Sequence, residues 1–319
     1  MSLTAVRQLR RPEAAPSADD FEFFTRPLPI LGAGQVLVEN RYLSVDPYMR
    51  EYMEFGGWEK GFGLEGRAIG GVVESNEPSL PVGTTVFHRH SWATHAVLTA
   101  ADARPITPAD GVPLSAYLGI LGGTGLTAYV GLTRIARLQP GDDVFISAAA
   151  GAVGSAAGQI ARLLGAGRIV GSAGSAAKVD HLTRDLGFDA AFNYKDGAVT
   201  DLLAKAAPDG VDVYFDNVGG DHLAAAIDAL RNRGRVAWCG AVAQYNNLRT
   251  PPSAPHNLFD VVGKNLRIEG FLVASHLDAR EEFETFLAPH VRSGAVVVNE
   301  TVVDGFPNLV EAFLGMLRG

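Results

Sequence analysis

The sequence predicts an α/β protein in which a strand-rich domain is followed by a doubly wound parallel sheet. Short alternating apolar runs, separated by Gly, Pro and Asn, occupy residues 36–98. After residue 114, apolar strands alternate with Ala- and Leu-rich helical stretches, which is typical of parallel sheets. The chain has 319 residues and 47% hydrophobic content, enough for two buried cores. We expect the domain boundary near residues 115–120.

The strands of the first domain are expected at residues 36–39, 70–74 and 94–98, where apolar and polar positions alternate. Such half-buried strands, joined by Gly- and Pro-rich turns, indicate a compact barrel-like domain. The second domain carries longer apolar runs. Six parallel strands are expected there, at residues 143–148, 168–172, 190–194, 211–215, 235–239 and 266–271, and six is a complete set for a dinucleotide-binding fold.

Composition excludes several classes of partner and compartment. Lys and Arg number 27 against 35 Asp and Glu, and no basic stretch could follow a nucleic-acid backbone. The single cysteine, Cys239, cannot form an intramolecular disulfide, which suits a reducing cytoplasm. Residues 1–12 lack the apolar core of a secretory signal. Of two uncharged windows, 111–133 is broken by Pro and Gly, and 144–161 is dominated by Ala, Gly and Ser and divides into a strand and a Gly-rich turn, so no membrane span is expected.

A glycine-rich turn joins the first expected parallel strand to a helix at residues 148–158. Gly151 and Gly154 supply backbone without side chains where a pyrophosphate would approach a helix N-terminus, and Ala149 takes the first small position. The alternative is an Ala- and Gly-rich helix packed closely on the sheet. The surrounding six-strand pattern favours the cofactor turn, whose other members are Ala152 and Val153.

Residues 171–178, after the second expected strand, indicate which cofactor binds. A site for NAD would place Asp or Glu there to accept hydrogen bonds from the ribose hydroxyls, and this segment contains neither. Gly174 and Ser175 lie there instead, and Lys178 can supply a cation for a 2′-phosphate. We therefore expect NADPH. In the alternative interpretation, Lys178 is a solvated residue in the first turn of a helix.

Residues suited to a catalytic metal or a nucleophile are not grouped in this sequence. A catalytic zinc needs three ligands from Cys, His, Asp or Glu. His88, His90 and His95 are close in sequence, but no cysteine lies near them. We interpret these histidines as surface or hydrogen-bonded residues. No Gly-x-Ser-x-Gly element indicates a serine nucleophile.

Several motifs together resemble those of the medium-chain dehydrogenase/reductases. Within that superfamily they resemble the zinc-free branch, which contains prostaglandin and leukotriene reductases, plant alkenal reductases and bacterial curcumin reductases. The resemblance covers nearly the whole chain. It rests on Leu-Ser-Val-Asp-Pro-Tyr-Met-Arg at residues 43–50, the 148–158 turn, Gly-Phe-Asp at 187–189 with Phe-Asn-Tyr-Lys at 192–195, Tyr-Phe-Asp-Asn-Val-Gly-Gly at 214–220, and Cys-Gly-Ala at 239–241 leading to Tyr245.

This resemblance implies a GroES-like catalytic domain of residues 1–118, completed by about 296–319, and a Rossmann cofactor domain of residues 119–295. It implies that residues 151–154 hold the pyrophosphate and that Lys178 and Tyr194 contact the 2′-phosphate. Asn217 would lie along the cofactor, and Tyr245 near the nicotinamide ribose. The nicotinamide end would be held by Cys239, Gly240, Ala241, Phe271, Leu272 and Val273, with Thr127 nearby.

The implied reaction is NADPH-dependent reduction of the carbon–carbon double bond of an α,β-unsaturated ketone or aldehyde. The hydroxyl of Tyr245, with the ribose hydroxyl that it orients, would stabilise the charge on the carbonyl oxygen. Tyr48 would close the other side of the cleft, and solvent would protonate the α-carbon. For each tyrosine the alternative is a half-buried packing residue with its hydroxyl in water. A quinone reductase and a non-catalytic NADPH-binding protein remain the rival functions.

Three further features bear on substrate range, cofactor affinity and assembly. Gly123 and Thr124 replace the family's Met-Pro, which removes a bulky wall of the substrate pocket. Relatives continue beyond the position of Gly319 into an Asn-containing turn and a last strand, so we expect either weaker NADPH binding or a shortened chain. The apolar segment 265–275 is expected to be an exposed edge strand, through which relatives form homodimers.

Overall fold

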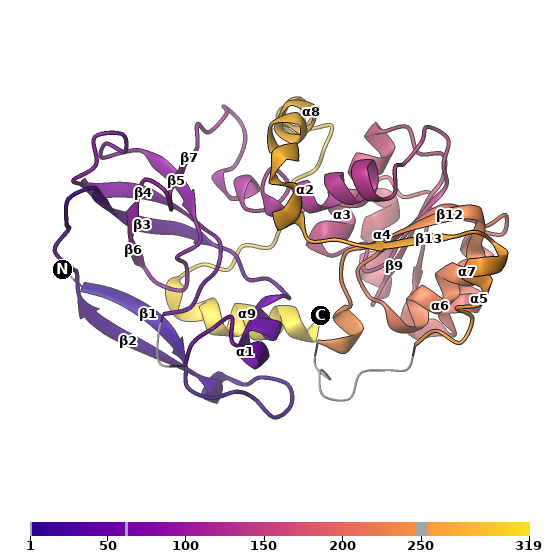
Figure 1. Cartoon of the computed structure of the whole chain (residues 1–319), viewed down its shortest axis with the longest axis horizontal. Coiled ribbons are helices and arrows are strands. Elements are labelled where there is room, and N and C mark those ends of the chain that lie inside the picture. Colours follow the sequence, from indigo (N-terminus) through magenta and orange to yellow (C-terminus); the bar gives the residue numbers. More distant parts are fainter. Residues whose placement is uncertain (1, 61–62, 246–253) are drawn as a thin grey trace. The chain divides into compact units, whose positions relative to one another are not determined.

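The computed structural model describes residues 2–60, 63–245 and 254–319, which fold into two compact units (Figure 1). The first unit comprises residues 1–118 and 301–319, and the second comprises residues 119–300. No helix in the described part of the chain is long and apolar enough to cross a membrane.

The first unit contains two antiparallel sheets. In the smaller sheet, β1 (Ser2–Gln8) pairs with β2 (Phe21–Pro27). The larger sheet has the order β6-β3-β4-β5-β7. The predicted strand segments lie in β3, β4 and β6, so the strand-rich character of this domain is confirmed. The strands of the larger sheet are β3 (Gln35–Leu43), β4 (Ala68–Ser75), β5 (Thr85–His88), β6 (His95–Thr99) and β7 (Arg104–Pro105).

The last helix of the chain belongs to the core of the first unit. Phe313 of α9 is fully buried, and its ring lies 5.5 Å from that of Trp92 and 6.1 Å from that of Phe21. Such edge-to-face aromatic pairs add about 0.5–1.5 kcal/mol each beyond the burial of their area. The helices of this unit are η1 (Ala18–Asp20), α1 (Met49–Phe55), η2 (Leu114–Tyr117), η7 (Phe306–Asn308) and α9 (Leu309–Arg318).

The second unit is built on a parallel sheet of order β10-β9-β8-β11-β12-β13, and all six predicted strands are present. β12 begins at Leu230, five residues before the predicted start. The prediction missed this part because residues 231–234 are polar or Gly and do not match an apolar strand pattern. The strands are β8 (Val144–Ile146), β9 (Ile169–Ala173), β10 (Ala190–Asn193), β11 (Val211–Asp216), β12 (Leu230–Trp238) and β13 (Arg267–Gly270).

The last strand is shorter than predicted. β13 ends at Gly270, and residues that were expected to continue it begin η6 (Val273–Ala279). A short apolar run is compatible with either a strand or a helix, and periodicity does not distinguish them. The expectation of a strand reaching residue 275 is therefore wrong, although β13 does form an edge of the sheet.

Helices cover both faces of the parallel sheet. Adjacent residues of β11 show this: Tyr214 packs in a core cluster with Leu203 of α5 and Leu223 of α6, whereas the ring of Phe215 contacts Gly131 of η3. Burial on both faces explains the continuous apolar runs of these strands. The helices of this unit are α2 (Gly123–Val130), η3 (Gly131–Ile135), α3 (Ala152–Leu163), α4 (Ala176–Arg184), η4 (Tyr194–Asp196), α5 (Val199–Ala206), α6 (Gly220–Ala229), η5 (Val242–Gln244), α7 (Asp260–Gly263), η6 and α8 (Arg280–Arg292).

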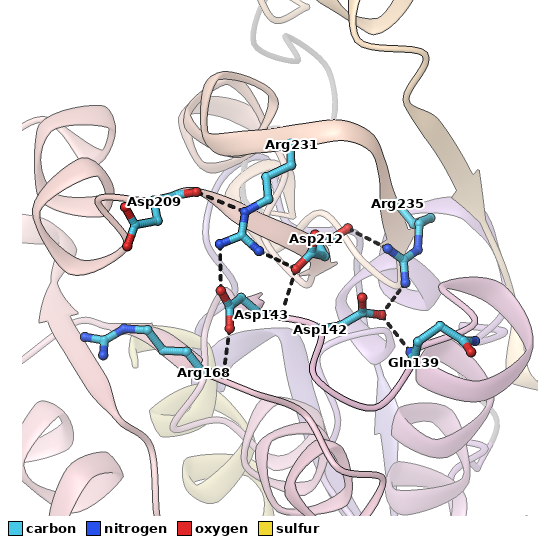
Figure 2. Close-up of polar contacts among 8 residues, drawn as sticks. All are labelled: Gln139, Asp142, Asp143, Arg168, Asp209, Asp212, Arg231 and Arg235. Carbon is cyan, nitrogen blue, oxygen red and sulfur yellow. Dashed lines mark hydrogen bonds and ion pairs between the residues drawn. The ribbon is translucent and has the colours of Figure 1, made fainter.

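A network of arginine–aspartate pairs connects the strands near their amino-terminal ends (Figure 2). Arg231 of β12 donates to Asp143, just before β8, at 2.7 Å, and to Asp212 of β11 at 2.6 Å. Arg235 pairs in turn with Asp142. Ligands of doubly wound sheets bind at the opposite, carboxyl ends of the strands. We therefore attribute a structural role to this network, and the candidate site lies elsewhere.

Candidate functional site

Nearly all of the predicted cofactor residues follow the carboxyl ends of the parallel strands. Because these ends share one edge of a parallel sheet, the fold gathers residues from widely separated parts of the sequence there. Thr127 lies on α2. The others are Gly151, Ala152, Val153 and Gly154 after β8, Gly174, Ser175 and Lys178 after β9, Tyr194 after β10, Asn217 after β11, Cys239, Gly240, Ala241 and Tyr245 after β12, and Phe271, Leu272 and Val273 after β13.

The turn after β8 requires glycine for a backbone contact. A Cβ atom at Gly154 would lie 2.4 Å from the carbonyl oxygen of Ala148 and 2.7 Å from the Cα atom of Ala149. Ala148 itself has a φ of +46°, a left-handed conformation that alanine rarely adopts. Gly151 is the N-cap of the twelve-residue helix α3, whose first backbone N–H groups have no acceptor within the helix. This combination of close backbone and helix N-terminus fits a pyrophosphate.

The segment after β9 offers groups for an anion. Ser175 is the N-cap of α4, and its Oγ accepts the backbone N–H of Lys178 at 3.3 Å. The serine hydroxyl hydrogen is not used in that bond and can donate elsewhere. Lys178 is exposed in the first turn of α4. Tyr194 lies against Gly174, where a Cβ atom would meet the tyrosine ring at 3.1 Å.

The turn after β11 holds Asn217 through contacts that sequence reasoning missed. The side-chain amide of Asn217 donates to the carbonyl oxygen of Ser147 at 2.8 Å, and its backbone N–H donates to the Ser147 Oγ at 3.0 Å. Ser147, Tyr214 and Asp216 are all fully buried at this place. The signal in the sequence is weak: a polar residue at the end of each of two apolar strands.

The turn after β12 carries the predicted nicotinamide end. Tyr245 places its hydroxyl beside Gly240, where a Cβ atom would lie 3.3 Å from that oxygen. The backbone N–H of Val242 donates to the carbonyl oxygen of Asn217 at 3.1 Å, so this turn is joined to the preceding one. Burial, followed by the charge of Asp216, raises the pKa of the Cys239 thiol to about 12. Cys239 is therefore a neutral thiol at physiological pH and not a nucleophile.

Tyr48 lies in the first unit, directly before α1. Its hydroxyl is buried and has no hydrogen-bond partner among the residues that the structure describes, so the alternative of a hydroxyl in water is wrong. Burial raises the pKa of Tyr48 well above its usual value, and the nearby carboxylates of Asp46 and Glu65 add to the shift. The Tyr48 hydroxyl therefore remains protonated and can act as a hydrogen-bond donor.

Among the histidines near β5, the ring of His88 is hydrogen-bonded within the protein. Nδ1 of His88 accepts the backbone N–H of His90 at 3.1 Å, which leaves the ring proton on Nε2, 2.8 Å from Oδ1 of Asn40. Burial lowers the pKa of His88 to about 4, so the ring is neutral. Within residues 2–60, 63–245 and 254–319, no group of three or more His, Cys, Asp or Glu side chains is arranged to hold a metal ion.

Comparison with known proteins places both units among oxidoreductases. A family model described as the N-terminal domain of oxidoreductase matches residues 5–106, and one described as zinc-binding dehydrogenase matches residues 152–291. Prostaglandin reductase 1 of Rattus norvegicus is 42% identical over 96% of this chain and 93% of its own. The 2-alkenal reductase (NADP(+)-dependent) of Nicotiana tabacum is 39% identical over 90% and 85%. The structure of CurA from Vibrio vulnificus in complex with NADPH matches with a TM-score of 0.90 and 31% identity, over 99% of this chain and 96% of the other.

Proposed function

Since the chain belongs to the zinc-independent branch of the medium-chain dehydrogenase/reductases, we propose that it reduces the carbon–carbon double bond of α,β-unsaturated ketones or aldehydes with NADPH. The observation that carries this proposal is the match, over nine-tenths or more of the chain, to prostaglandin and 2-alkenal reductases. The arrangement of groups at the carboxyl edge of the second unit supports it.

The residues at that edge fit NADPH. The Gly151 to Gly154 turn and the N-terminus of α3 would hold the pyrophosphate, and Ser175 and Lys178 would hold the 2′-phosphate. No carboxylate lies between residues 171 and 178 to repel that phosphate. When bound, NADPH supplies the hydride that reduces the substrate at its β-carbon.

The protein's own task is to stabilise the charge that builds on the substrate oxygen. We assign this to Tyr245, whose hydroxyl lies beside Gly240 in the turn after β12. Tyr48 is a second catalytic candidate, acting as a neutral donor because burial raises the pKa of its hydroxyl. Solvent would deliver the proton to the α-carbon. The high pKa of Cys239 prevents its thiolate from adding to the electrophilic double bond.

The decisive experiment follows NADPH oxidation by the purified protein with an alkenone, with a chelator present, and identifies the product by NMR. The saturated ketone is the expected product. An allylic alcohol would show hydride attack at the carbonyl carbon and overturn the double-bond assignment. A quinone assayed in parallel tests the main rival, since a strong preference for the quinone would indicate a quinone reductase. No turnover with either acceptor, despite NADPH binding, would indicate a non-catalytic binding protein.

The role of Tyr245 is tested by Tyr245→Phe, which removes only the hydroxyl. Loss of one transition-state hydrogen bond should lower kcat by about tenfold to a hundredfold. Tyr129→Phe is the matched control, because the Tyr129 hydroxyl is already used as a donor to Glu282 at 2.6 Å. Equal kcat values for the two variants would remove Tyr245 from the mechanism.

For assembly we propose a homodimer in the cytoplasm, joined through β13. This strand has no further neighbour among the described strands, and Leu272 just beyond it is 75% exposed. An open groove of about 490 Å³ runs past residues 269–272. Pairing of β13 with its copy across a two-fold axis would extend the sheet and cover the edge. Light scattering that reports the mass of one chain at micromolar concentration would contradict this arrangement.

A further inference from the structure

Ser147, Tyr214 and Asp216 form a buried polar cluster at the carboxyl ends of β8 and β11. All three residues have no exposed surface, so none of them can touch a ligand at the sheet edge. The Tyr214 ring stacks on Phe145 at 4.9 Å, which fixes the direction of its hydroxyl. Any effect of this cluster on ligand binding must therefore pass through the residues that it contacts.

Asp216 shapes the turn that carries Asn217. Its Oδ1 accepts the backbone N–H groups of Val218 and Gly219, both at 2.8 Å, and the hydroxyl of Tyr214 at 2.7 Å. A carboxylate that accepts the amides two and three residues ahead holds the chain in a tight turn. Tyr214 orients that carboxylate.

Ser147 joins the same turn to β8. Its Oγ lies 3.0 Å from the Tyr214 hydroxyl and accepts the backbone N–H of Asn217 at 3.0 Å. Ser147 directly precedes Ala148, where the turn with Gly151 and Gly154 begins. The cluster thus connects the turn assigned to the pyrophosphate with the turn that carries Asn217.

The backbone of Asp216 extends these connections to a third turn. Its carbonyl oxygen accepts the N–H of Cys239 at 2.8 Å and that of Gly240 at 3.1 Å. Both residues belong to the predicted nicotinamide end. The turns after β8, β11 and β12 therefore all connect to one buried carboxyl residue.

Burial of this polar cluster is energetically unfavourable. Oδ2 of Asp216 is buried with no hydrogen-bond partner among the described residues, and burial raises the pKa of this carboxyl. An unsatisfied polar atom in a core lowers stability, whereas an apolar residue would avoid that cost. Polar groups that hold binding residues in place are one reason to keep such an arrangement.

We infer that Ser147, Tyr214 and Asp216 are positioning residues that hold Asn217 and the neighbouring turns in their binding geometry before NADPH arrives. This inference rests on the proposed function, because it assumes that these turns bind NADPH. It adds to that proposal a set of residues that act on the cofactor without contacting it.

The test is Tyr214→Phe, which keeps the ring stacked on Phe145. Loss of one buried hydrogen bond in the cluster should raise the Kd of NADPH by about threefold to tenfold. The Kd of NADH should rise by the same factor, because the affected turns do not hold the 2′-phosphate, and kcat at saturating NADPH should stay close to wild type. Ser172→Ala on β9 is the matched control: Ser172 is equally buried, and its hydroxyl has no partner among the described residues. The Kd of NADPH for Ser172→Ala should stay within about twofold of the wild-type value.

Ser147→Ala provides a second variant, which removes the acceptor of the Asn217 N–H. Both variants are measured by fluorescence titration and by thermal melting. A lowered Tm with unchanged Kd values in both variants would make the cluster purely structural and overturn the inference. Wild-type protein that fails to bind NADPH would instead refute the proposed function, so the two failures are distinguishable.

Discussion

Replacing Gly154 with alanine tests whether the turn after β8 is as tightly closed as its geometry indicates. The added Cβ atom would lie 2.4 Å from the carbonyl oxygen of Ala148, and both nearest neighbours are backbone atoms that cannot rotate away. Overpacking of this kind costs about 1–3 kcal/mol. Alanine gains at most about 1 kcal/mol over glycine in helix propensity. The clash is therefore expected to exceed the gain.

The assay combines thermal melting with NADPH titration. A net loss of about 1–2 kcal/mol should lower Tm by about 2–8 °C for a unit of this size. Because the clash displaces the backbone that would face the pyrophosphate, NADPH binding should weaken by about tenfold for every 1.4 kcal/mol of lost contact. Gly263→Ala in α7 is the control, since a Cβ atom there meets nothing within 4 Å. An unchanged Tm and Kd in Gly154→Ala would refute the argument from backbone contact.

Three other predictions address the cofactor preference, the arginine network and the pH dependence of stability. Lys178→Ala should raise the Michaelis constant for NADPH about tenfold and leave that for NADH nearly unchanged, since one charge-assisted contact is lost; equal effects in steady-state kinetics would contradict the assignment. Arg231→Met should lower the free energy of unfolding by about 1–3 kcal/mol in urea titrations, because the carboxylates of Asp143 and Asp212 lose their arginine partner. Arg184→Met, which breaks an exposed pair, should lower it by less than about 1 kcal/mol. The folded-state pKa of His88 is lowered from 6.5 to about 4, so unfolded chains take up a proton first as pH falls and stability is lost across that window by up to about 3 kcal/mol; urea midpoints at pH 7.5 and 4.5 should therefore differ less in His88→Gln than in wild type.

Much of the fold follows from local pattern. Strands of the second unit are buried on both faces and are therefore continuous apolar runs in the sequence. Strands of the first unit are half-buried, so their apolar and polar residues alternate. The glycine turn was recognisable because strand, Gly-x-x-Gly and helix follow one another directly in the sequence. Each of these signals depends on residues within a few positions of one another, and so a single sequence carries them.

Periodicity in the sequence determined neither the length of the last strand nor the core to which the last helix belongs. Residues 271–274 are apolar in a way that suits both strand and helix, and in the structure η6 begins at Val273. Phe313 belongs with Trp92 and Phe21 because of a contact between distant parts of the chain. Periodicity identifies which face of an element is apolar but not which other element covers it.

The candidate site divides in the same way. The sequence by itself determined the order of the strands along the chain, the glycines of the cofactor turn and the missing carboxylate near Lys178, because each is a local property of the residues. Only the tertiary structure decided that Ser147 and Asp216 meet, since that contact exists because β8 and β11 are neighbours in the sheet. It also decided that the hydroxyl of Tyr48 is buried and that both ring nitrogens of His88 are engaged. Burial and hydrogen bonding depend on what the folded chain brings together, so residues far apart in the sequence acquire their chemistry only in three dimensions.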